Sequence, residues 1–350
     1  MDDADAAGCR DRLLTWFAAS ARSLPWRTRP RDPYRVVVSE LMLQQTQVDR
    51  VVPYFERFVD RFPGWQALAA ACEDEVVAAW SGLGYYRRAR HLHRLAGEVV
   101  ARGGLPSAPA DLERLPGIGP YTAAAVASQA FGVAVPVLDG NVRRVAARVL
   151  AFSGDPRSAD GERRMRAWVG ALLPDDRPGD LNEALMELGA TVCAPSAPSC
   201  AICPLLGACA AAARGDPTAY PRPRSRRPTE EVAWTAVCCV DPEGRWLLRR
   251  VLDGPVLRGL WLPPLVDGDL SDDLQRAVQA AGLRAAPARV RSAGAVRHGI
   301  THRRITVHVV ALEVAEGEEG EGWSWVDPCG TGVPTSSLLA KLVAAVEMTE

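Results

Sequence analysis

The stretch CAPSAPSCAICPLLGAC, residues 193–209, decides how the rest of this 350-residue chain is interpreted. Its cysteines are Cys193, Cys200, Cys203 and Cys209, with six, two and five residues between successive ones. The prolines between them prevent a continuous helix and favour a loop around a bound group. Thiolates this dense, in a chain without a recognisable secretory leader, are typical of metal ligands rather than disulfides.

Four thiolates suit either a structural zinc ion or a cubane iron–sulfur cluster. Zinc sites usually pair two short Cys-x-x-Cys hooks across a longer gap, and here only the hook from Cys200 to Cys203 is present. The spacing therefore favours an iron–sulfur cluster. The other cysteines form no convincing motif, and we interpret them as core or incidental thiols.

The composition is that of a globular protein, with 48% hydrophobic and 24% charged residues. A chain of this length can bury the cores of two domains. Residues 1–20 are polar and charged, without an apolar run long enough for a signal peptide or a membrane span. We therefore expect a cytoplasmic protein without a membrane partner. Residues 1–227 carry 29 Arg against 25 acids, a balance that is compatible with nucleic acid without establishing it.

Residues 8–213 are predicted to form an all-α domain. Asp32-Pro33 provides a helix cap followed by proline at the first helical position, and it opens an apolar stretch that ends near Leu43. Further helices are predicted over about 50–61, 73–80, 87–102, 120–130, 140–151, 160–172 and 180–191. Residues 214–229 are rich in proline and arginine and are predicted to be a linker.

Residues 230–350 are predicted to form a small α+β domain. The runs Val232–Val240 and Trp246–Val251 are strand-like, and the turn residues 241–244 join them as a hairpin. A third strand is predicted over 304–314, with helices over about 271–281 and 335–347.

Two acids stand out from the helical domain. Glu40 interrupts a strongly apolar stretch, so burial would desolvate its carboxylate and raise its pKa. A surface position is the simpler explanation for an isolated glutamate such as Glu40. Asp139 precedes Gly140-Asn141, where a role as a helix cap would be enough to explain it. Cleavage of an N-glycosidic bond requires two carboxyl groups in different settings. One protonates the leaving group, and the other stays ionised to stabilise the cationic sugar.

The turn LPGIGP, residues 115–120, contains Gly117 and Gly119 immediately before a predicted helix. Such a turn can present backbone N–H groups and a helix N-terminus to a phosphate. A tight connection between two helices explains the glycines equally well, since Gly-x-Gly alone is a weak signal.

Four segments together resemble the A/G-mismatch adenine DNA glycosylases of the helix-hairpin-helix superfamily. They are the cysteine loop, the stretch around Glu40, the turn at residues 115–120 and the stretch around Asp139. The resemblance spans about residues 24–335. It implies a glycosylase domain with a helix-hairpin-helix motif at about 112–125 and a [4Fe-4S] cluster on the loop 193–209. It also implies a following Nudix-like domain that recognises 8-oxoguanine.

The resemblance also implies roles for single residues. Glu40 would protonate adenine at N7, and Asp139 would stabilise the cationic sugar with support from Tyr121 and Asn141. The adenine pocket would be formed by Arg22, Leu24, Trp26, Arg27 and Glu183, although Trp26 is equally compatible with an ordinary core aromatic. Gln45 and Tyr85 would wedge into the base stack beside the lesion, which compensates for unstacking the flipped nucleotide; helix packing is the alternative for Tyr85.

In the second domain, Thr301 and His302 would read the lesion. The family usually has Phe-Ser-His where this chain has Ile300-Thr301-His302, so a hydroxyl and the histidine are kept and the aromatic ring is lost. Residues 272–282 lack the paired glutamates of a Nudix box, which predicts recognition rather than hydrolysis.

Two other functions fit parts of this pattern. A glycosylase/lyase for oxidised pyrimidines needs a lysine nucleophile where Tyr121 stands, and Lys341 is the only lysine in the chain. A thymine glycosylase of the same fold is harder to exclude, while a DNA-binding module without catalysis would not need both Glu40 and Asp139. We therefore predict a monofunctional hydrolase that releases adenine from A·8-oxoG or A·G pairs in double-stranded DNA, for which a monomer suffices.

Overall fold

The computed structural model describes residues 3–222, 228–253, 256–283, 289–314, 322–328, 330 and 333–348. The chain divides into two compact units, one formed by Met1–Ala70 with His91–Ser225 and the other by Ala71–Arg90 with Arg226–Glu350. Part of the predicted linker, residues 223–227, lies outside the described residues, and the bounds of the two domains stay a prediction.

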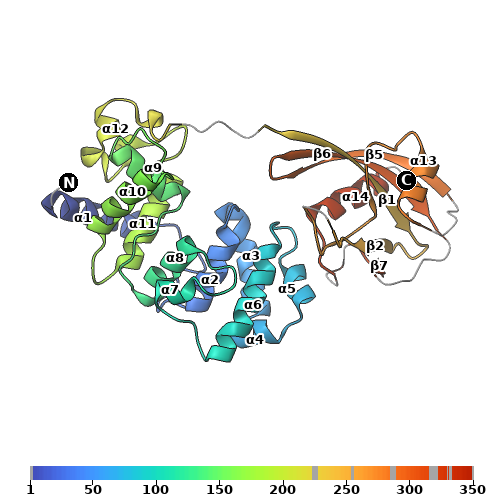
Figure 1. Cartoon of the computed structure of the whole chain (residues 1–350), viewed down its shortest axis with the longest axis horizontal. Helices are drawn as coiled ribbons and strands as arrows, with labels where there is room; N and C mark the ends of the chain where they lie inside the picture. The colour runs from blue at the N-terminus through green and yellow to red at the C-terminus, as the bar shows by residue number, and fades with distance from the viewer. Residues whose placement is uncertain are drawn as a thin grey trace. The chain divides into compact units, whose positions relative to one another are not determined.

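The described part of residues 3–222 is helical, as predicted (Figure 1). Its α-helices are α1 (Asp3–Ser20), α2 (Pro33–Leu43), α3 (Val48–Arg61), α4 (Trp65–Ala70), α5 (Glu73–Ala79), α6 (Arg87–Arg102), α7 (Pro109–Leu112), α8 (Pro120–Phe131), α9 (Gly140–Val149), α10 (Ala159–Leu172), α11 (Pro178–Thr191) and α12 (Ala210–Ala213). Short 3₁₀ turns are η1 (Cys200–Ile202), η2 (Leu206–Ala208) and η3 (Pro217–Ala219).

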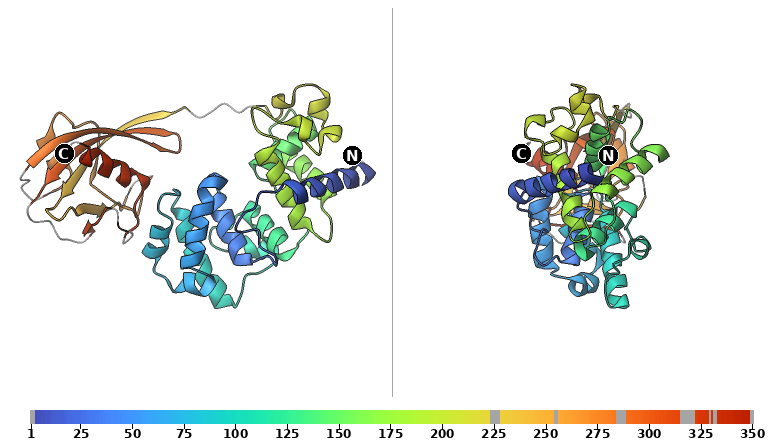
Figure 2. Two further views of the ribbon diagram at one scale, coloured as in Figure 1. Left: turned by 180° about the vertical axis from the view of Figure 1, so that it is seen from behind. Right: turned by 90° about the vertical axis from the view of Figure 1, so that its left-hand side faces the viewer.

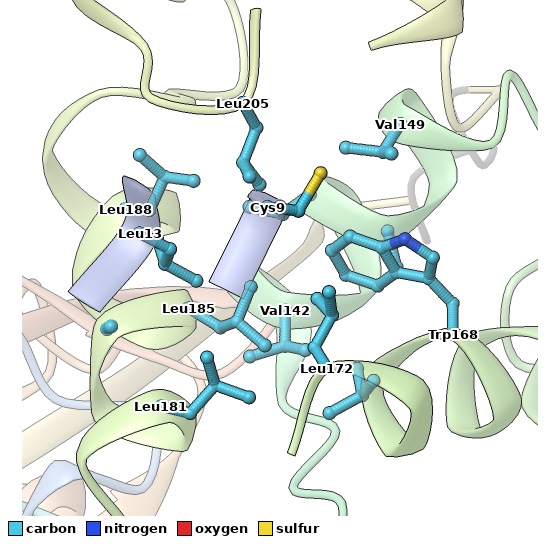
Figure 3. Close-up of a cluster of buried hydrophobic side chains, with 14 of the residues drawn as sticks. Cys9, Leu13, Val142, Val149, Trp168, Leu172, Leu181, Leu185, Leu188 and Leu205 are labelled. Carbon is cyan, nitrogen blue, oxygen red and sulfur yellow. The ribbon is translucent and has the colours of Figure 1, made fainter. Parts of the chain in front are cut away.

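A large hydrophobic core forms where α1, α9, α10 and α11 meet (Figure 3). Leu13, Val142, Leu172 and Leu185 are completely buried there, so their apolar surface is removed from water. Leu205, from the cysteine loop, inserts into the same core and is 1% exposed. The loop is thereby anchored to the helices that carry Asp139 and Glu183.

A tight turn joins α7 to α8. Gly117 has a φ of +78°, and a Cβ at this position would lie 2.5 Å from the Cβ of His91. Both the backbone conformation and the close approach therefore require glycine. Gly119, by contrast, caps α8 with a negative φ, and nothing near it would obstruct a side chain.

The second unit contains a seven-stranded mixed sheet among its described residues. The strands are β1 (Glu230–Val240), β2 (Trp246–Arg250), β3 (Trp261–Leu262), β4 (Leu265–Asp267), β5 (Arg289–Ile300), β6 (Arg303–Glu313) and β7 (Trp323–Val326). Their order is β3-β2-β1-β6-β5; β4 also pairs with β1, and β7 with β2. β1 and β6 run parallel over their full lengths, and β5 and β6 form a long antiparallel hairpin.

Each face of this sheet has its own apolar cluster. The helix α14 (Ser337–Glu347) contributes Leu338, Leu342 and Val346 to one cluster, and α13 (Leu274–Ala280) contributes Ala277 to the other. The predicted α+β class is confirmed. The short strands β3, β4 and β7 and the long strand β5 were not predicted. In β5, glycines and exposed arginines interrupt the apolar alternation expected of a strand.

Views from behind and from one side show the cysteine loop, in yellow-green, beside the green helices of the core (Figure 2). In the part of the chain that the structure describes, no helix combines the length and the apolar character needed to cross a bilayer.

Candidate active site

The start of α2 is set by its cap. The Asp32 carboxylate accepts a hydrogen bond from the N–H of Tyr34 at 2.9 Å, and Pro33 occupies the first helical position, as predicted. Most of the helix is buried because it lies between α3 and α8 in the fold. This places Glu40 in the protein interior, where it is 5% exposed.

Both carboxylate oxygens of Glu40 accept a hydrogen bond. The Gln129 side-chain amide donates to Oε1 and the Tyr121 hydroxyl donates to Oε2, each at 2.9 Å. Both donors come from α8, which therefore fixes the orientation of the acid.

Burial raises the pKa of Glu40 to about 7, because the ionised carboxylate loses its hydration. The hydrogen bonds from Gln129 and Tyr121 oppose this shift, whereas the negative charges of Asp139 and Glu183 add to it. A carboxyl group with a pKa near neutrality can hold a proton and transfer it at physiological pH.

Asp139 caps the start of α9. Its carboxylate accepts the N–H of Val142 at 2.6 Å and the side-chain amide of Asn141 at 2.9 Å. Burial raises the pKa of Asp139, and these donors together with the charge of Arg144 act in the opposite direction. The expected ionised carboxylate is thus favoured by its hydrogen bonds and disfavoured by its burial.

Tyr121 links the two acids electrostatically. Burial raises its pKa well above the ordinary value, and the charges of Glu40 and Asp139 contribute to the shift. The structure therefore brings Glu40, Tyr121, Asp139 and Asn141 together, although they come from three segments of the sequence.

The predicted pocket residues form part of an ion-pair network on α11. Arg22 pairs with Glu187 at 2.6 Å, and Arg27 pairs with Glu183 at 3.0 Å and with Glu187 at 2.9 Å. Arg31 also pairs with Glu183. Burial would raise the pKa of Glu187, but its arginine partners hold that pKa below the ordinary value.

The other two predicted pocket residues, Trp26 and Leu24, are apolar and are not part of the ion pairs. Trp26 is 4% exposed and packs edge-to-face on Phe55, with ring centroids 5.2 Å apart. This is the core-aromatic arrangement that the sequence left open. Leu24 is half-buried, and its carbonyl closes a turn by accepting the N–H of Arg27.

Three of the residues predicted to contact DNA or to read the lesion have an unusual backbone conformation. Gln45, Tyr85 and Thr301 have φ values of 59°, 50° and 57°, although none is glycine. Each side chain is exposed. Left-handed conformations at residues with a Cβ cost free energy and occur preferentially at functional sites. Gln45 lies in the first unit, and Tyr85 and Thr301 belong to the second.

Thr301 and His302 form the two-residue turn between β5 and β6. Ile300 and Arg303 are the last paired residues of the hairpin. The Thr301 hydroxyl donates to the carbonyl of Ile300 at 2.6 Å, and His302 lies 3.4 Å from the carboxylate of Glu230.

The four predicted metal-ligating cysteines line one cavity and all carry free thiols. No three His, Cys, Asp or Glu side chains of the described residues converge closely enough to hold a single metal ion. Four thiols around one cavity are nevertheless a donor set of the kind that both zinc sites and iron–sulfur clusters use. The donor set is therefore compatible with the predicted iron–sulfur group.

A buried arginine supports this loop and was not predicted. Arg148 is 2% exposed; its guanidinium lies 3.2 Å from the Cys193 sulfur and donates to the carbonyls of Ala194 and Pro195, each at 2.7 Å. A guanidinium in this place would stabilise an anionic cluster and hold the loop backbone.

Other residues at the site were also not predicted from the sequence. The completely buried Asn182 accepts the N–H of Val137 and donates to the carbonyl of Val135, so it fixes the segment that leads to Asp139. A polar residue in an apolar helical stretch was the available signal for Gln129, whereas Asn182 stands among the polar residues Asp180 and Glu183 and offered none. Glu187 offered the same signal as Gln129, because it lies between Met186 and Leu188, but its partner Arg22 is 165 residues away and could not be predicted.

The fold and the paired carboxyl groups define a helix-hairpin-helix DNA glycosylase. Residues 38–170 match the family described as HhH-GPD superfamily base excision DNA repair protein. A thermostable thymine-DNA glycosylase has a similar structure, with a TM-score of 0.53, 27% identity and coverage of 60% of this chain and 98% of that chain. Endonuclease III in a DNA complex shares the fold, with a TM-score of 0.51, 22% identity and coverage of 61% and 98%.

The chain belongs to the adenine DNA glycosylase family, as the sequence predicted. The adenine DNA glycosylase of Homo sapiens is 36% identical, with 91% of this chain and 69% of the relative covered. That of Mus musculus is 35% identical over 96% and 77%. That of Mycolicibacterium smegmatis is 46% identical over 55% and 66%. The protein is accordingly a base excision repair enzyme that hydrolyses N-glycosidic bonds.

Proposed function

We propose that the enzyme releases adenine mispaired with 8-oxoguanine or guanine in double-stranded DNA. The observation that carries the proposal is the pair formed by the buried Glu40 and the half-buried Asp139, in which the first carboxyl group has a pKa of about 7 and the second is held by several donors. The identity to adenine DNA glycosylases over most of the chain supports adenine as the base.

Glu40 would donate its proton to N7 of a flipped adenine, which makes the base a better leaving group. As the glycosidic bond breaks, positive charge develops on the sugar, and the Asp139 carboxylate would stabilise it. Hydrogen bonds from Asn141 and Val142 keep this carboxylate oriented. Water then completes hydrolysis and leaves an abasic site.

Strand cleavage is not part of the proposal, because the lyase reaction requires an amine. Tyr121 is hydrogen-bonded to Glu40, and the ammonium group of Lys341 donates to the carbonyl of Arg297 in the second unit.

We also propose that Cys193, Cys200, Cys203 and Cys209 hold a [4Fe-4S] cluster. When bound, the cluster would cross-link the loop, which Leu205 already anchors to the core, and it would not take part in base release. Gln45, Tyr85 and the turn at Gly117 and Gly119 are assigned to DNA contacts. The adenine pocket is assigned to Arg22, Leu24, Trp26, Arg27 and Glu183, and Glu187 holds the two arginines.

The lesion would be read at the β5–β6 turn of the second, Nudix-like domain. Because the Thr301 hydroxyl donates to Ile300, its lone pairs can accept the N7–H of 8-oxoguanine. Guanine has an acceptor at N7 and would not be bound in this way.

Thr301→Ala is therefore expected to lower the preference for A·8-oxoG over A·G by roughly fivefold to tenfold, the value of about one hydrogen bond. Thr301→Ser keeps the hydroxyl and serves as the control. The measurement is the ratio of single-turnover excision rates on the two duplexes. An unchanged ratio in Thr301→Ala would show that this hydroxyl does not read the lesion.

The function is tested by incubating the protein with duplexes that contain A·8-oxoG, A·G, T·G or thymine glycol, followed by alkali. Nicking that depends on alkali and occurs only at adenine is the expected result. Release of thymine from T·G would favour the thymine glycosylase, which the structural similarity keeps as the second candidate. Nicking without alkali at thymine glycol would contradict the proposal. A cytoplasmic monomer remains our expectation for the working form.

A further inference from the structure

We infer that Gln129 is a positioning residue that holds the Glu40 carboxyl group in place and sets how readily it keeps its proton. The inference deepens the proposed function and rests on the acid role of Glu40. Its basis is the hydrogen bond from the Gln129 amide to Oε1 of Glu40 at 2.9 Å.

The contact is made between two side chains that are both removed from water. Glu40 is 5% exposed and Gln129 is 7% exposed, so neither group exchanges this hydrogen bond for one to solvent. Because Tyr121 occupies Oε2, loss of Gln129 would leave Oε1 without its described partner in a desolvated site.

The backbone around Gln129 is held as well. Gly179, at the start of α11, lies so close that a Cβ there would be 2.5 Å from the carbonyl oxygen of Ser128 and 2.9 Å from Cα of Gln129. The amide is therefore presented to Glu40 from a fixed helix.

An amide is chemically suited to this position. The groups that act electrostatically on Glu40 are Tyr121, Asp139 and Glu183, and the two acids favour the protonated form. An arginine in place of Gln129 would strongly favour the ionised form, so Glu40 would be deprotonated at neutral pH. An aliphatic side chain would leave Tyr121 as the one described side chain that orients the carboxyl group, and it would make that group more firmly protonated. The neutral amide orients the carboxylate and lowers its pKa only in part, so proton transfer remains possible near pH 7.

The test is the pH dependence of single-turnover adenine excision in Gln129→Leu. Since the amide favours the ionised form, its removal raises the pKa of Glu40. The alkaline fall in activity is therefore expected to move upward by about one pH unit. The plateau rate at lower pH is expected to fall about tenfold because the acid is no longer oriented. Binding of a duplex with a non-cleavable adenosine analogue should stay within about twofold of wild type.

Gln129→Asn keeps the amide but is one methylene too short to make the contact, so it should shift the profile in the same direction. It also keeps the inference testable if the leucine variant does not fold. Ser128→Ala is the matched control, because this buried hydroxyl bonds to the carbonyl of Ala125 within α8; its profile should not move. An alkaline limb that stays in place in both Gln129 variants would overturn the inference. If Glu40→Gln also keeps its activity, the proposed acid role itself fails.

Discussion

Replacement of Glu40 by glutamine is expected to lower adenine excision by roughly 10³-fold while DNA binding persists. Glutamine fits the same space and can still bond to Tyr121 and Gln129, but it has no acidic proton to give to the base. Single-turnover excision and binding of a non-cleavable duplex would be measured on the same preparation. The control is Glu98→Gln, which makes the same chemical change at an exposed position on α6. Residual turnover within tenfold of wild type would contradict the acid role.

Glu40→Gln is also expected to change the stability of the protein. This change would show that the loss of excision is not caused by misfolding. The folded-state pKa of Glu40, about 7, lies above the ordinary value of 4.5, so folding favours the protonated form. The contribution of protonated Glu40 to the free energy of unfolding is complete below about pH 4.5 and is lost as the pH rises through 7. Glutamine carries no charge at any pH. Glu40→Gln should therefore exceed wild type in free energy of unfolding by on the order of 3 kcal/mol above pH 7, and by much less at pH 5. Chemical denaturation at both pH values checks this.

Of the substitutions proposed for this protein, Cys203→Ala should cause the largest loss in the free energy of unfolding. The change removes one of four proposed cluster ligands beside Leu205, which anchors the loop in the core. Loss of a structural metal group is expected to cost roughly 4 kcal/mol or more. Iron and sulfide content, thermal unfolding and excision are expected to fall together.

Cys72→Ser is the control, because Cys72 is exposed and lies outside the loop. Wild-type protein that contains zinc and no iron or sulfide would overturn the cluster assignment in favour of the alternative that the sequence left open. Full iron content in Cys203→Ala would remove Cys203 from the ligand set.

Features that depend on near neighbours in the chain were predictable. The cap at Asp32, the turn at 241–244 and the density of cysteines in 193–209 are properties of short segments, whose local hydrogen bonding and spacing largely fix their structure. The core position of Glu40 was predictable for the same reason, since the apolar residues around it imply burial. The strand β5 was missed because its pairing with β6, and not its own composition, makes it a strand.

By itself, the sequence determined which chemical groups the protein has: two acids, a tyrosine in the place of a lysine, and four clustered thiols. Only the tertiary structure decided how these groups behave. Gln129 reaches Glu40 across 89 residues of sequence, and Arg27 reaches Glu183 across 156. A pKa depends on the loss of hydration and on the charges and donors within a few ångströms, and folding alone brings those distant groups together.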